Sequence, residues 1–209
     1  MSSAKLPDRI RRESTLSLSQ RLITTILRRV DVVAADLDLA AKEPTTAEVT
    51  QIEKASLPAY LALRPHASRE VVVHRLQQGQ QCYALWVDAA IVSVCWVATG
   101  PVRIDYLNAV LVLAPTDVYM FDAYTAPAHR GHTLAADVYR QIMWNSCRHG
   151  MRRSVGLLAV ENRPGRQVVL KLGWRVIGRY TLVRAGPWRR WMLVSSHGEK
   201  ALPVLRTNQ

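Results

Sequence analysis

The 209-residue sequence contains no apolar run that could cross a lipid bilayer. A membrane-spanning helix needs about 20 consecutive apolar residues, and no stretch of the chain approaches this length. The N-terminus also lacks an apolar signal-peptide core followed by a cleavage site of small residues. We therefore expect a protein without a transmembrane segment that stays in the cytoplasm.

Cysteine is scarce, and its spacing is uninformative for metal or disulfide chemistry. The three copies, Cys82, Cys95 and Cys147, form no Cys-x-x-Cys pair, and their odd number argues against a disulfide framework. His129 and His132 have a spacing that metal ligands can use, but no cluster of Cys, Asp or Glu completes a site. The sequence thus predicts reduced cysteines and no metal site.

Internal repeats and linkers rich in proline or glycine are also missing, which favours one main domain. Hydrophobic residues make up 49% of the chain and charged residues 21%, a composition that disordered proteins do not have. We expect a domain over residues 46–195 and a flexible tail over 196–209. Residues 1–45 would add a basic amphipathic helix and an extra strand over 31–39, both packed on the core.

What the sequence does contain is a strand, a short loop and an amphipathic helix in succession. Residues 118–125 are aromatic and β-branched, and a proline follows them. Apolar residues then recur at helical spacing from about 134 to 143. The free N–H groups of the first helical turn, with the helix dipole, form an anion site, to which Arg130 and Gly131 add charge and close backbone approach. This loop predicts a site for a pyrophosphate.

A second segment repeats the order of strand and helix further along the chain. A strand is expected over residues 154–160, followed by Glu161 and Asn162. A short helix over 169–174 then ends at a glycine, Gly173, as helices often do. Upstream of both segments, a helix over 70–79 and two strands over 83–87 and 91–97 complete the pattern.

This succession resembles the GNAT superfamily of acyl-CoA N-acyltransferases. The superfamily has a loop of the form Arg/Gln-x-x-Gly-x-Gly/Ala, then an Asn after the next strand, then a helix reading roughly Tyr-x-Lys-x-Gly-Phe. The matching positions here are Arg130 to Ala135, Asn162, Lys171, Gly173 and Trp174. The resemblance implies an α/β fold whose central mixed, mostly antiparallel sheet is splayed at the cofactor strand and flanked by helices.

Two positions depart from the superfamily pattern. Thr133 stands where the loop usually has its middle glycine, so its side chain would lie close to a bound pyrophosphate. Val169 replaces the frequent tyrosine that is credited with protonating the departing thiolate. That route to a general acid is therefore absent.

The resemblance also implies the co-substrate and its contacts. Acetyl-CoA, or another acyl-CoA, would bind along the end of the strand over 118–125 and the following loop. The implied contact residues are Ala123, Tyr124, Thr125, Arg130, Gly131, His132, Thr133, Leu134, Ala135, Asn162 and Lys171.

Acyl transfer by direct attack of an amine on the thioester requires a base and a proton donor for the leaving sulfur. Asp122 and Tyr124 point to the same face of a strand, beside the expected thioester. Burial would raise the pKa of Asp122 and make it a base, while Tyr124 would serve the sulfur. The alternative role of Asp122 is that of an ion-pair partner for an arginine, and Glu161 is the competing base.

The positive charge of the chain leaves several partners open. The formal net charge is +12, and residues 148–190 carry eleven basic residues against one acid, Glu161. Such a field suits an anionic acceptor, an acidic acyl carrier protein, nucleic acid or an anionic membrane surface, and it equally suits a solvated basic face. Trp188 and Trp191 flank two arginines and predict the start of a last strand. An apolar stripe over residues 22–30 predicts a helix that packs on the domain.

We therefore expect an N-acyltransferase that moves an acyl group, most simply acetyl, from its coenzyme A thioester to a primary amine. One alternative is a GNAT-like module without activity that binds nucleic acid or an acidic protein. Another is a long-chain acyltransferase served by acyl carrier protein. The acceptor and the oligomeric state, including a homodimer, stay open.

Overall fold

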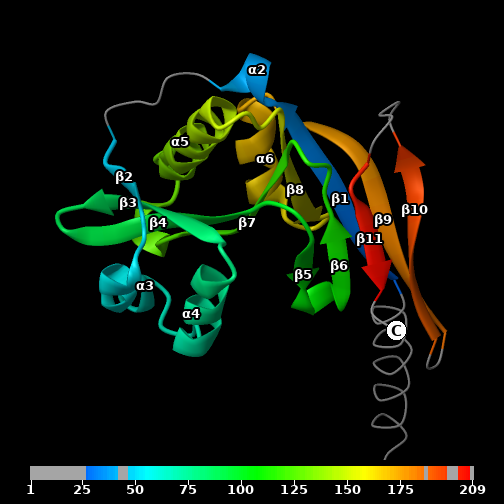
Figure 1. Ribbon diagram of the computed structural model, residues 1–209, viewed down its shortest axis with the longest axis horizontal. Coiled ribbons are helices and arrows are strands. Elements are labelled where there is room, and N and C mark those ends of the chain that lie inside the picture. Colours follow the sequence, from blue (N-terminus) through cyan, green and yellow to red (C-terminus); the bar gives the residue numbers. More distant parts are fainter. Residues whose placement is uncertain (1–26, 42–46, 186–187, 197–201, 208–209) are drawn as a thin grey trace, which may run out of the picture.

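The computed structural model describes residues 27–41, 47–185, 188–196 and 202–207. Its main feature is an eight-stranded sheet with the order β10-β9-β1-β8-β7-β4-β3-β2 (Figure 1). The strands are β1 (Leu27–Asp36), β2 (Val49–Gln51), β3 (Gln81–Val87), β4 (Ala90–Ala98), β7 (Asp117–Thr125), β8 (Arg153–Ala159), β9 (Arg175–Ala185) and β10 (Trp188–Ser196). The β7–β8 pair is parallel, and the other described neighbours in this sheet are antiparallel.

A smaller sheet and the helices cover both faces of the large sheet. The small sheet has the order β11-β6-β5. Its strands are β5 (Val102–Ile104), β6 (Ala109–Val112) and β11 (Val204–Thr207). The α-helices are α2 (Leu37–Ala40), α3 (Leu57–Leu63), α4 (Arg69–Gln77), α5 (Leu134–Arg148) and α6 (Arg163–Lys171). Single turns of 3-10 helix, η1 (Lys54–Ser56), η2 (Asp105–Leu107) and η3 (Pro127–His129), join several of them.

The core follows from the alternation of side chains along the strands. In β1, Val33 and Ala35 point to the face covered by α5, whereas Val30, Val32 and Ala34 point to the face covered by the small sheet. A third apolar cluster lies where α3 and α4 pack on β3 and β4. Strands buried on both faces explain the high apolar content of the chain.

The N-terminal expectations need correction. The expected strand over 31–39 is present but spans residues 27–36 as β1, which lies between β8 and β9 and so belongs to the sheet of the domain that was expected to start at residue 46. The strand ends at Asp36, whose carboxylate accepts the N–H of Asp38 at 3.0 Å and caps α2. Leu27 and Val30, taken as part of a helical stripe, lie in this strand, and the basic segment before residue 27 lies outside the described residues.

The C-terminal expectation also fails in part, because Val204–Thr207 form β11 within the predicted flexible tail. This strand pairs with β6, and the hydroxyl of Tyr180 donates to the carbonyl of Pro203 at 2.6 Å just before it. The tryptophan-flanked segment begins strand β10, as predicted, although β11 follows it. α6 begins at Arg163, six residues earlier than predicted, because Asn162 caps it.

The remaining predictions for the elements are close to the structure. α4, β3, β4, β7 and β8 start and end within two residues of the predicted bounds, and α5 begins where predicted but continues to Arg148, five residues beyond the predicted periodicity. The three cysteines are free, with Cys82 and Cys95 buried and Cys147 half-buried. Among the described helices, none combines the length and apolar character needed to cross a membrane.

Candidate acyl-transfer site

The parallel strands β7 and β8 are paired at one end only. Their register runs from the Asp117–Arg153 pair to the Tyr119–Val155 pair and then stops, although β7 continues to Thr125 and β8 to Ala159. Figure 1 shows the resulting two halves of the sheet, with β4 and β3 beside β7, and β1, β9 and β10 beside β8. The sheet therefore opens beyond Tyr119.

A buried ion pair holds the closed end of these strands together. The carboxylate of Asp117, which is 2% exposed, accepts Nε and Nη2 of Arg153 at 2.9 and 2.7 Å. It also accepts the N–H of Ala114 at 3.2 Å. A two-pronged contact of this kind fixes both strands in one register.

The open end of β7 contains a β-bulge. Val94 of β4 faces Tyr124 and Trp96 faces Phe121, so Asp122 and Ala123 together oppose the single residue Cys95. Asp122 has a φ of +48°, a left-handed conformation that aspartate tolerates better than most residues. The bulge bends the strand away from β8 and turns Asp122 toward α3 and α4.

Beyond the bulge, backbone groups of β7 point toward the opening. Ala126 donates its N–H to Val92 of β4 at 2.9 Å, and Tyr124 pairs with Val94 two residues earlier. Alternation in an antiparallel ladder then directs the N–H and C=O of Thr125 away from β4. The Thr125 carbonyl accepts Nε of Arg130 at 3.1 Å. Of the three amides expected at the thioester, that of Tyr124 is thus turned to β4.

A cleft of about 1230 Å³ lies at this opening. Residues 119–123 of β7 and 156–158 of β8 form two walls, and α4, η2 and the start of α6 supply the others. The backbone is closely packed at Gly156, where an added Cβ would lie 3.1 Å from Cγ2 of Val33 and 3.2 Å from Cζ3 of Trp174 and would require these side chains to shift. The cleft has the size of a site for a small molecule or cofactor.

Asp122 and Tyr124, at and just beyond the bulge of β7, share a contact with Arg64. Both carboxylate oxygens of Asp122 are occupied, by Nη1 of Arg64 and Nη1 of Arg75, each at 2.6 Å. The Arg64 guanidinium lies 5.0 Å from the centre of the Tyr124 ring, and that of Arg130 lies 5.8 Å from it. The pairing with two arginines favours the ion-pair interpretation of Asp122 over that of a base.

The loop between β7 and α5 is exposed and ends in a left-handed residue. Gly131 has a φ of +87° and Thr133 a φ of +59°, and α5 begins directly afterwards at Leu134. The N–H groups of Leu134 and Ala135 lie in the first turn of α5, where no helical carbonyl is in position to accept a hydrogen bond from them. Residues 130–135 do not line the cleft, although free amides at a helix start are groups that can bind an anion.

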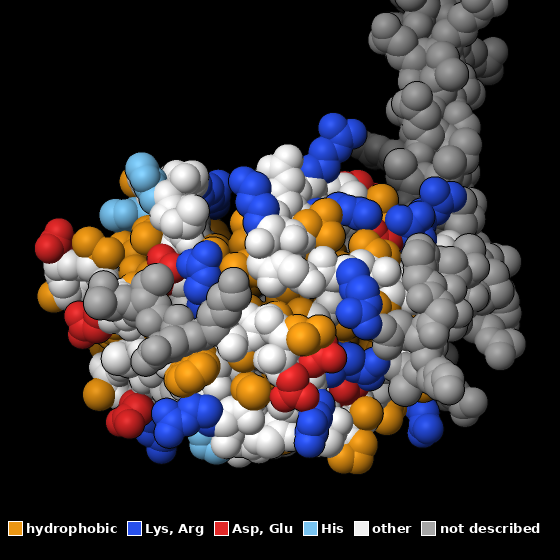
Figure 2. All heavy atoms as spheres, turned by 90° about the horizontal axis from the view of Figure 1, so that it is seen from above, with side chains coloured by type: hydrophobic (Ala, Val, Ile, Leu, Met, Phe, Trp, Pro, Cys, Tyr) orange, Lys and Arg blue, Asp and Glu red, His pale blue; other side chains and the backbone are white. Residues whose placement is uncertain are grey.

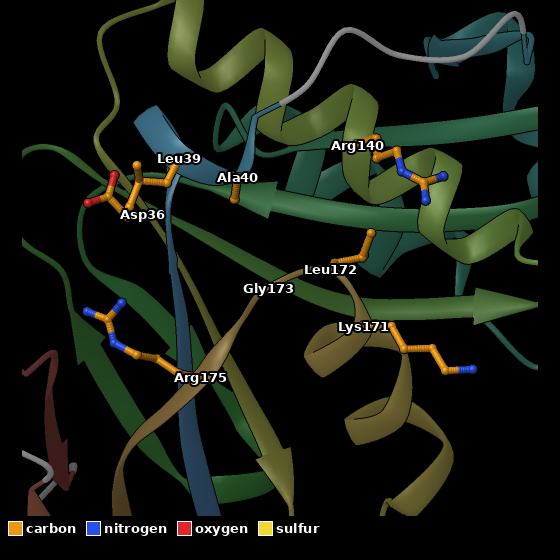
Figure 3. Close-up of a pocket in the computed structure, with 8 residues that line it drawn as sticks. All are labelled: Asp36, Leu39, Ala40, Arg140, Lys171, Leu172, Gly173 and Arg175. Carbon is orange, nitrogen blue, oxygen red and sulfur yellow. The ribbon is translucent and has the colours of Figure 1, made fainter.

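The structure separates the two predicted contacts on α6. Asn162 caps the helix by accepting the N–H of Gly165 at 3.0 Å, and it lines the cleft. Lys171 lies at the opposite end of the helix and lines a second pocket of about 390 Å³ between α2, α5 and β9 (Figure 3). In that pocket Lys171 extends on the same side as Arg140. Glu161 is exposed in the turn before Asn162.

Comparison with solved structures identifies the fold. A putative GNAT-family acetyltransferase from Novosphingobium aromaticivorans has a TM-score of 0.54 and 15% identity, covering 74% of this chain and 62% of its own. A GCN5-related N-acetyltransferase from Sphaerobacter thermophilus has a TM-score of 0.51 and 17% identity, over 79% and 55%. A conserved Staphylococcus epidermidis protein of unknown function has a TM-score of 0.52 and 7% identity, over 85% and 66%.

This chain has the GNAT fold. The identities show the fold alone, and the chain spans less than two thirds of the length of each of these three proteins. No protein-family model and no curated protein matches the sequence. The resemblance inferred from the loop and α6 is thus confirmed at the level of the fold, including the sheet that splays at β7.

Within the GNAT fold, the departure at Val169 is buried. Val169 is 3% exposed and lines the cleft beside Trp174, whose indole N–H has no hydrogen-bond partner among the described residues. No hydroxyl therefore comes from this position. Two tyrosines of the wall are Tyr139, whose ring centre lies 6.3 Å from that of Trp174, and the buried Tyr119, whose ring stacks on Phe121 at 5.1 Å. Burial raises the pKa of Tyr119 well above its ordinary value.

The sequence prediction missed the wall formed by α4. Glu70, His74 and Arg75 of this helix all line the cleft. The Ser68 hydroxyl lies 2.5 Å from the Glu70 carboxylate and lowers the pKa of that group. The sequence predicted this helix, but no signal placed it beside a strand nearly 50 residues later in the chain.

The basic stretch over residues 148–190 is partly neutralised by acids from other segments. Arg166 and Arg179 both pair with Asp31, at 2.5 and 2.6 Å, and Asp31 is 2% exposed. Arg152 pairs with Asp38 and Arg153 with Asp117. Figure 2 shows basic side chains spread among apolar and acidic ones on the face that carries α2 and α5. The local count of charges therefore overstated the positive field.

Proposed function

We propose that this protein binds an acyl-CoA where β7 and β8 diverge and transfers the acyl group to an amine. The observation that carries the proposal is the register of these strands, which ends at Tyr119 and leaves residues 120–123 of β7 facing a cleft. An N-acetyltransferase using acetyl-CoA is the simplest form of this function. The two acetyltransferases with the same fold support it.

The backbone at the open end of β7 suits a thioester and its pantetheine arm. The amide of Thr125 points to the opening, and Ala123 lines the cleft. Preorganised amides of this kind stabilise an oxyanion by about 3 to 4 kcal/mol each. The GNAT fold would place the pyrophosphate at the rim formed by residues 130–135, where the α5 amides and Arg130 supply donors.

Arg130 and Thr133 would both bear on how the loop binds phosphate. Arg130 already donates to Thr125, so it would release this contact or use its two other nitrogens for phosphate. The side chain of Thr133 is exposed at the rim and can donate its hydroxyl to a phosphate oxygen. Asn162 lines the cleft near the start of α6 and stays among the proposed contacts. Lys171 lines the second pocket instead, and we no longer propose it as a contact of the acyl-CoA.

For the proton transfers, Tyr124 is the proposed donor to the leaving sulfur. Its ring lies between the guanidinium groups of Arg64 and Arg130, at the end of β7. Asp122 is assigned to holding Arg64 and Arg75, because both of its oxygens accept hydrogen bonds from them. Glu161, exposed beside Asn162, remains a proposed base. A Tyr124→Phe variant should lower kcat by at least about 100-fold at unchanged affinity for acetyl-CoA.

A thermal shift with acetyl-CoA tests the proposal. A ligand at 100 times its Kd stabilises the native state by about 2.7 kcal/mol and must raise Tm. Release of free thiol in the presence of mixed amines then reports transfer. Short-chain and long-chain acyl-CoA, and an acylated carrier protein, compared in the same assay, distinguish the donors.

A pair of arginine variants locates the binding. Arg130→Gln removes a guanidinium from the rim, and we expect the Kd for acetyl-CoA to rise by about 3- to 30-fold. Arg152→Gln removes an exposed guanidinium from a distant ion pair with Asp38 and should leave the Kd unchanged. If the protein does not bind acetyl-CoA but binds DNA or RNA in a salt-dependent way, it is a nucleic-acid-binding module instead.

A further inference from the structure

One wall of the cleft carries a cluster with more positive than negative charge. Asp122 is shared by Arg64 and Arg75, so two guanidinium groups face a single carboxylate. The three side chains are only a quarter to a third exposed, at 25%, 26% and 29%. Charges removed from water are ordinarily paired, so a second anion is expected at this cluster.

Arg75 and the Asp122 that it pairs with both line the cleft, whereas Arg64 does not. The Arg75 guanidinium lies 5.1 Å from the centre of the Trp96 ring and 5.3 Å from that of Phe121, which fixes its plane. Among the described residues, its single hydrogen bond is the one from Nη1 to Asp122. The other N–H groups of a guanidinium with five donors therefore stay available.

The other charges along the cleft do not take up this surplus. Arg103 and Asp105 pair with each other at 2.8 Å and are largely exposed. Glu70, on the same helix as Arg75, is fully exposed at the rim and is bonded to Ser68. His74 adds no negative charge. The available donors of Arg75 thus form the most sheltered unneutralised charge of the described cleft.

We propose that Arg75 binds a carboxylate carried by the amine acceptor, so that the acceptor is an amino acid or a related amino carboxylate. The inference rests on the proposed acyl transfer and names the substrate class for it. A guanidinium fork matches the two oxygens of a carboxylate, and a plane fixed by two aromatic rings loses little freedom on binding.

The position of the cluster agrees with an amine close to the carboxylate. Asp122, which holds Arg75, directly precedes Ala123 at the open edge of β7, where the thioester is proposed to lie. An acceptor anchored on Arg75 would present an amine one or two carbons away toward this edge. Phe121 and Tyr106 offer apolar surface in the same cleft for the remainder of the acceptor.

Matched pairs of amines test the inference. Each L-amino acid is compared with the amine that lacks its carboxylate, for example L-phenylalanine with 2-phenylethylamine. Thiol release gives kcat/KM for the wild type and for Arg75→Gln, and titration calorimetry gives binding without acetyl-CoA. The ratio of wild type to variant, taken for each compound, cancels the difference in amine basicity within a pair.

We expect Arg75→Gln to lower kcat/KM for the carboxylated member by about 10- to 100-fold and for the decarboxylated member by less than about 3-fold. Arg75→Lys keeps the charge but not the two-pronged guanidinium, and its kcat/KM for the carboxylated member should lie between those of the wild type and Arg75→Gln. Arg69→Gln removes an exposed arginine from the same helix outside the cleft and is the matched control. The Tm of each variant checks that the fold is kept.

The outcomes separate this inference from the proposed function. If acetyl-CoA binds and no amino carboxylate binds or reacts better than its decarboxylated partner, the inference is overturned and the acyl transfer stands. Equal losses for both members of a pair also overturn it. If acetyl-CoA does not bind at all, the proposed function fails, and calorimetry of the same pairs still decides whether Arg75 holds a carboxylate.

Discussion

Each end of β7 carries an aspartate that is paired with arginine, and the two aspartates are paired in different ways. At the closed end, Asp117 is 2% exposed and is matched by one arginine, Arg153, with two hydrogen bonds. At the open end, Asp122 is 29% exposed and is matched by two arginines with one bond to each oxygen. The first arrangement is neutral and sealed within the sheet, and the second leaves one positive charge beside a cleft.

This difference separates a structural ion pair from a candidate binding group on a single strand. A neutral buried pair sets the register but offers nothing to a ligand, because its donors and acceptors are used. A pair with a surplus guanidinium and partial exposure retains donors for a further partner. Substitutions at the two aspartates should therefore differ in what they damage.

Replacing Asp117 should have the largest effect on stability. Asp117→Asn removes the charge of the carboxylate to which the mostly buried Arg153 donates two hydrogen bonds, and breaking a buried pair in this way typically costs about 3 to 5 kcal/mol of unfolding free energy. Urea denaturation followed by tryptophan fluorescence measures the loss. A double variant, Asp117→Leu with Arg153→Met, should be less destabilised than Asp117→Asn, because no charge is then left unpaired. A loss below about 1 kcal/mol would remove the distinction between the two ends.

Replacing Asp122 should cost less stability. Asp122→Asn keeps a residue that tolerates a positive φ but leaves Arg64 and Arg75 facing each other at a partly exposed site. We expect a loss of about 1 to 3 kcal/mol, the range for hydrogen bonds to charged groups. The same denaturation experiment checks it, and added chloride should reduce the loss by screening the two arginines. A loss as large as that of Asp117→Asn would contradict the comparison.

Alkaline pH should act on the closed end through Tyr119, its last paired residue. Burial raises the pKa of Tyr119, so the phenol ionises more readily in the unfolded chain than in the folded one. Its contribution to stability is complete below the ordinary pKa of about 10 and is lost as pH rises above it. Unfolding free energies from pH 8 to 11 should fall more steeply for the wild type than for Tyr119→Phe, by at most about 1.4 kcal/mol per pH unit. Parallel curves would exclude this role.

The smallest expected effect is a gain in stability when Thr133, in the loop after the open end of β7, is replaced. Thr133 holds a left-handed conformation that costs a β-branched residue about 1 to 2 kcal/mol. Thr133→Gly should relieve this strain, and the greater freedom of glycine in the unfolded chain should offset part of the gain. We expect a net stabilisation of about 0.5 to 1 kcal/mol in thermal denaturation, whereas Thr133→Ala should give no comparable gain. A destabilised glycine variant would mean that the threonine side chain makes contacts that outweigh the strain.

The local elements could be read from the sequence because they depend on neighbouring residues. The strand and loop before α5 combine β-branched residues, a proline and helical periodicity within about 25 positions. The placement of β1 could not be read in this way, because its partners β8 and β9 follow more than 100 residues later. The partners of Asp122 were equally hidden, since Arg64 and Arg75 reach it from helices that pack on β4.

In the candidate site, too, features that depend on neighbouring residues could be predicted, and features that depend on tertiary packing could not. The rim of residues 130–135 follows from a local pattern, and its position at the start of α5 agrees with the structure. Lys171 matched a pattern in α6 but faces another pocket, because a helix of nine residues carries its two ends about 12 Å apart. The contribution of α4 depends on tertiary packing alone.

The insertion of β1 between β8 and β9 has a consequence for synthesis on the ribosome. This strand emerges early, yet the backbone groups along both of its edges find their partners only after residues 153–185 have been translated. Until then, its buried carboxylate at Asp31 also waits for Arg166 and Arg179. The nascent chain must therefore keep an apolar strand unpaired through most of translation, and chaperone dependence should follow from this one topological choice.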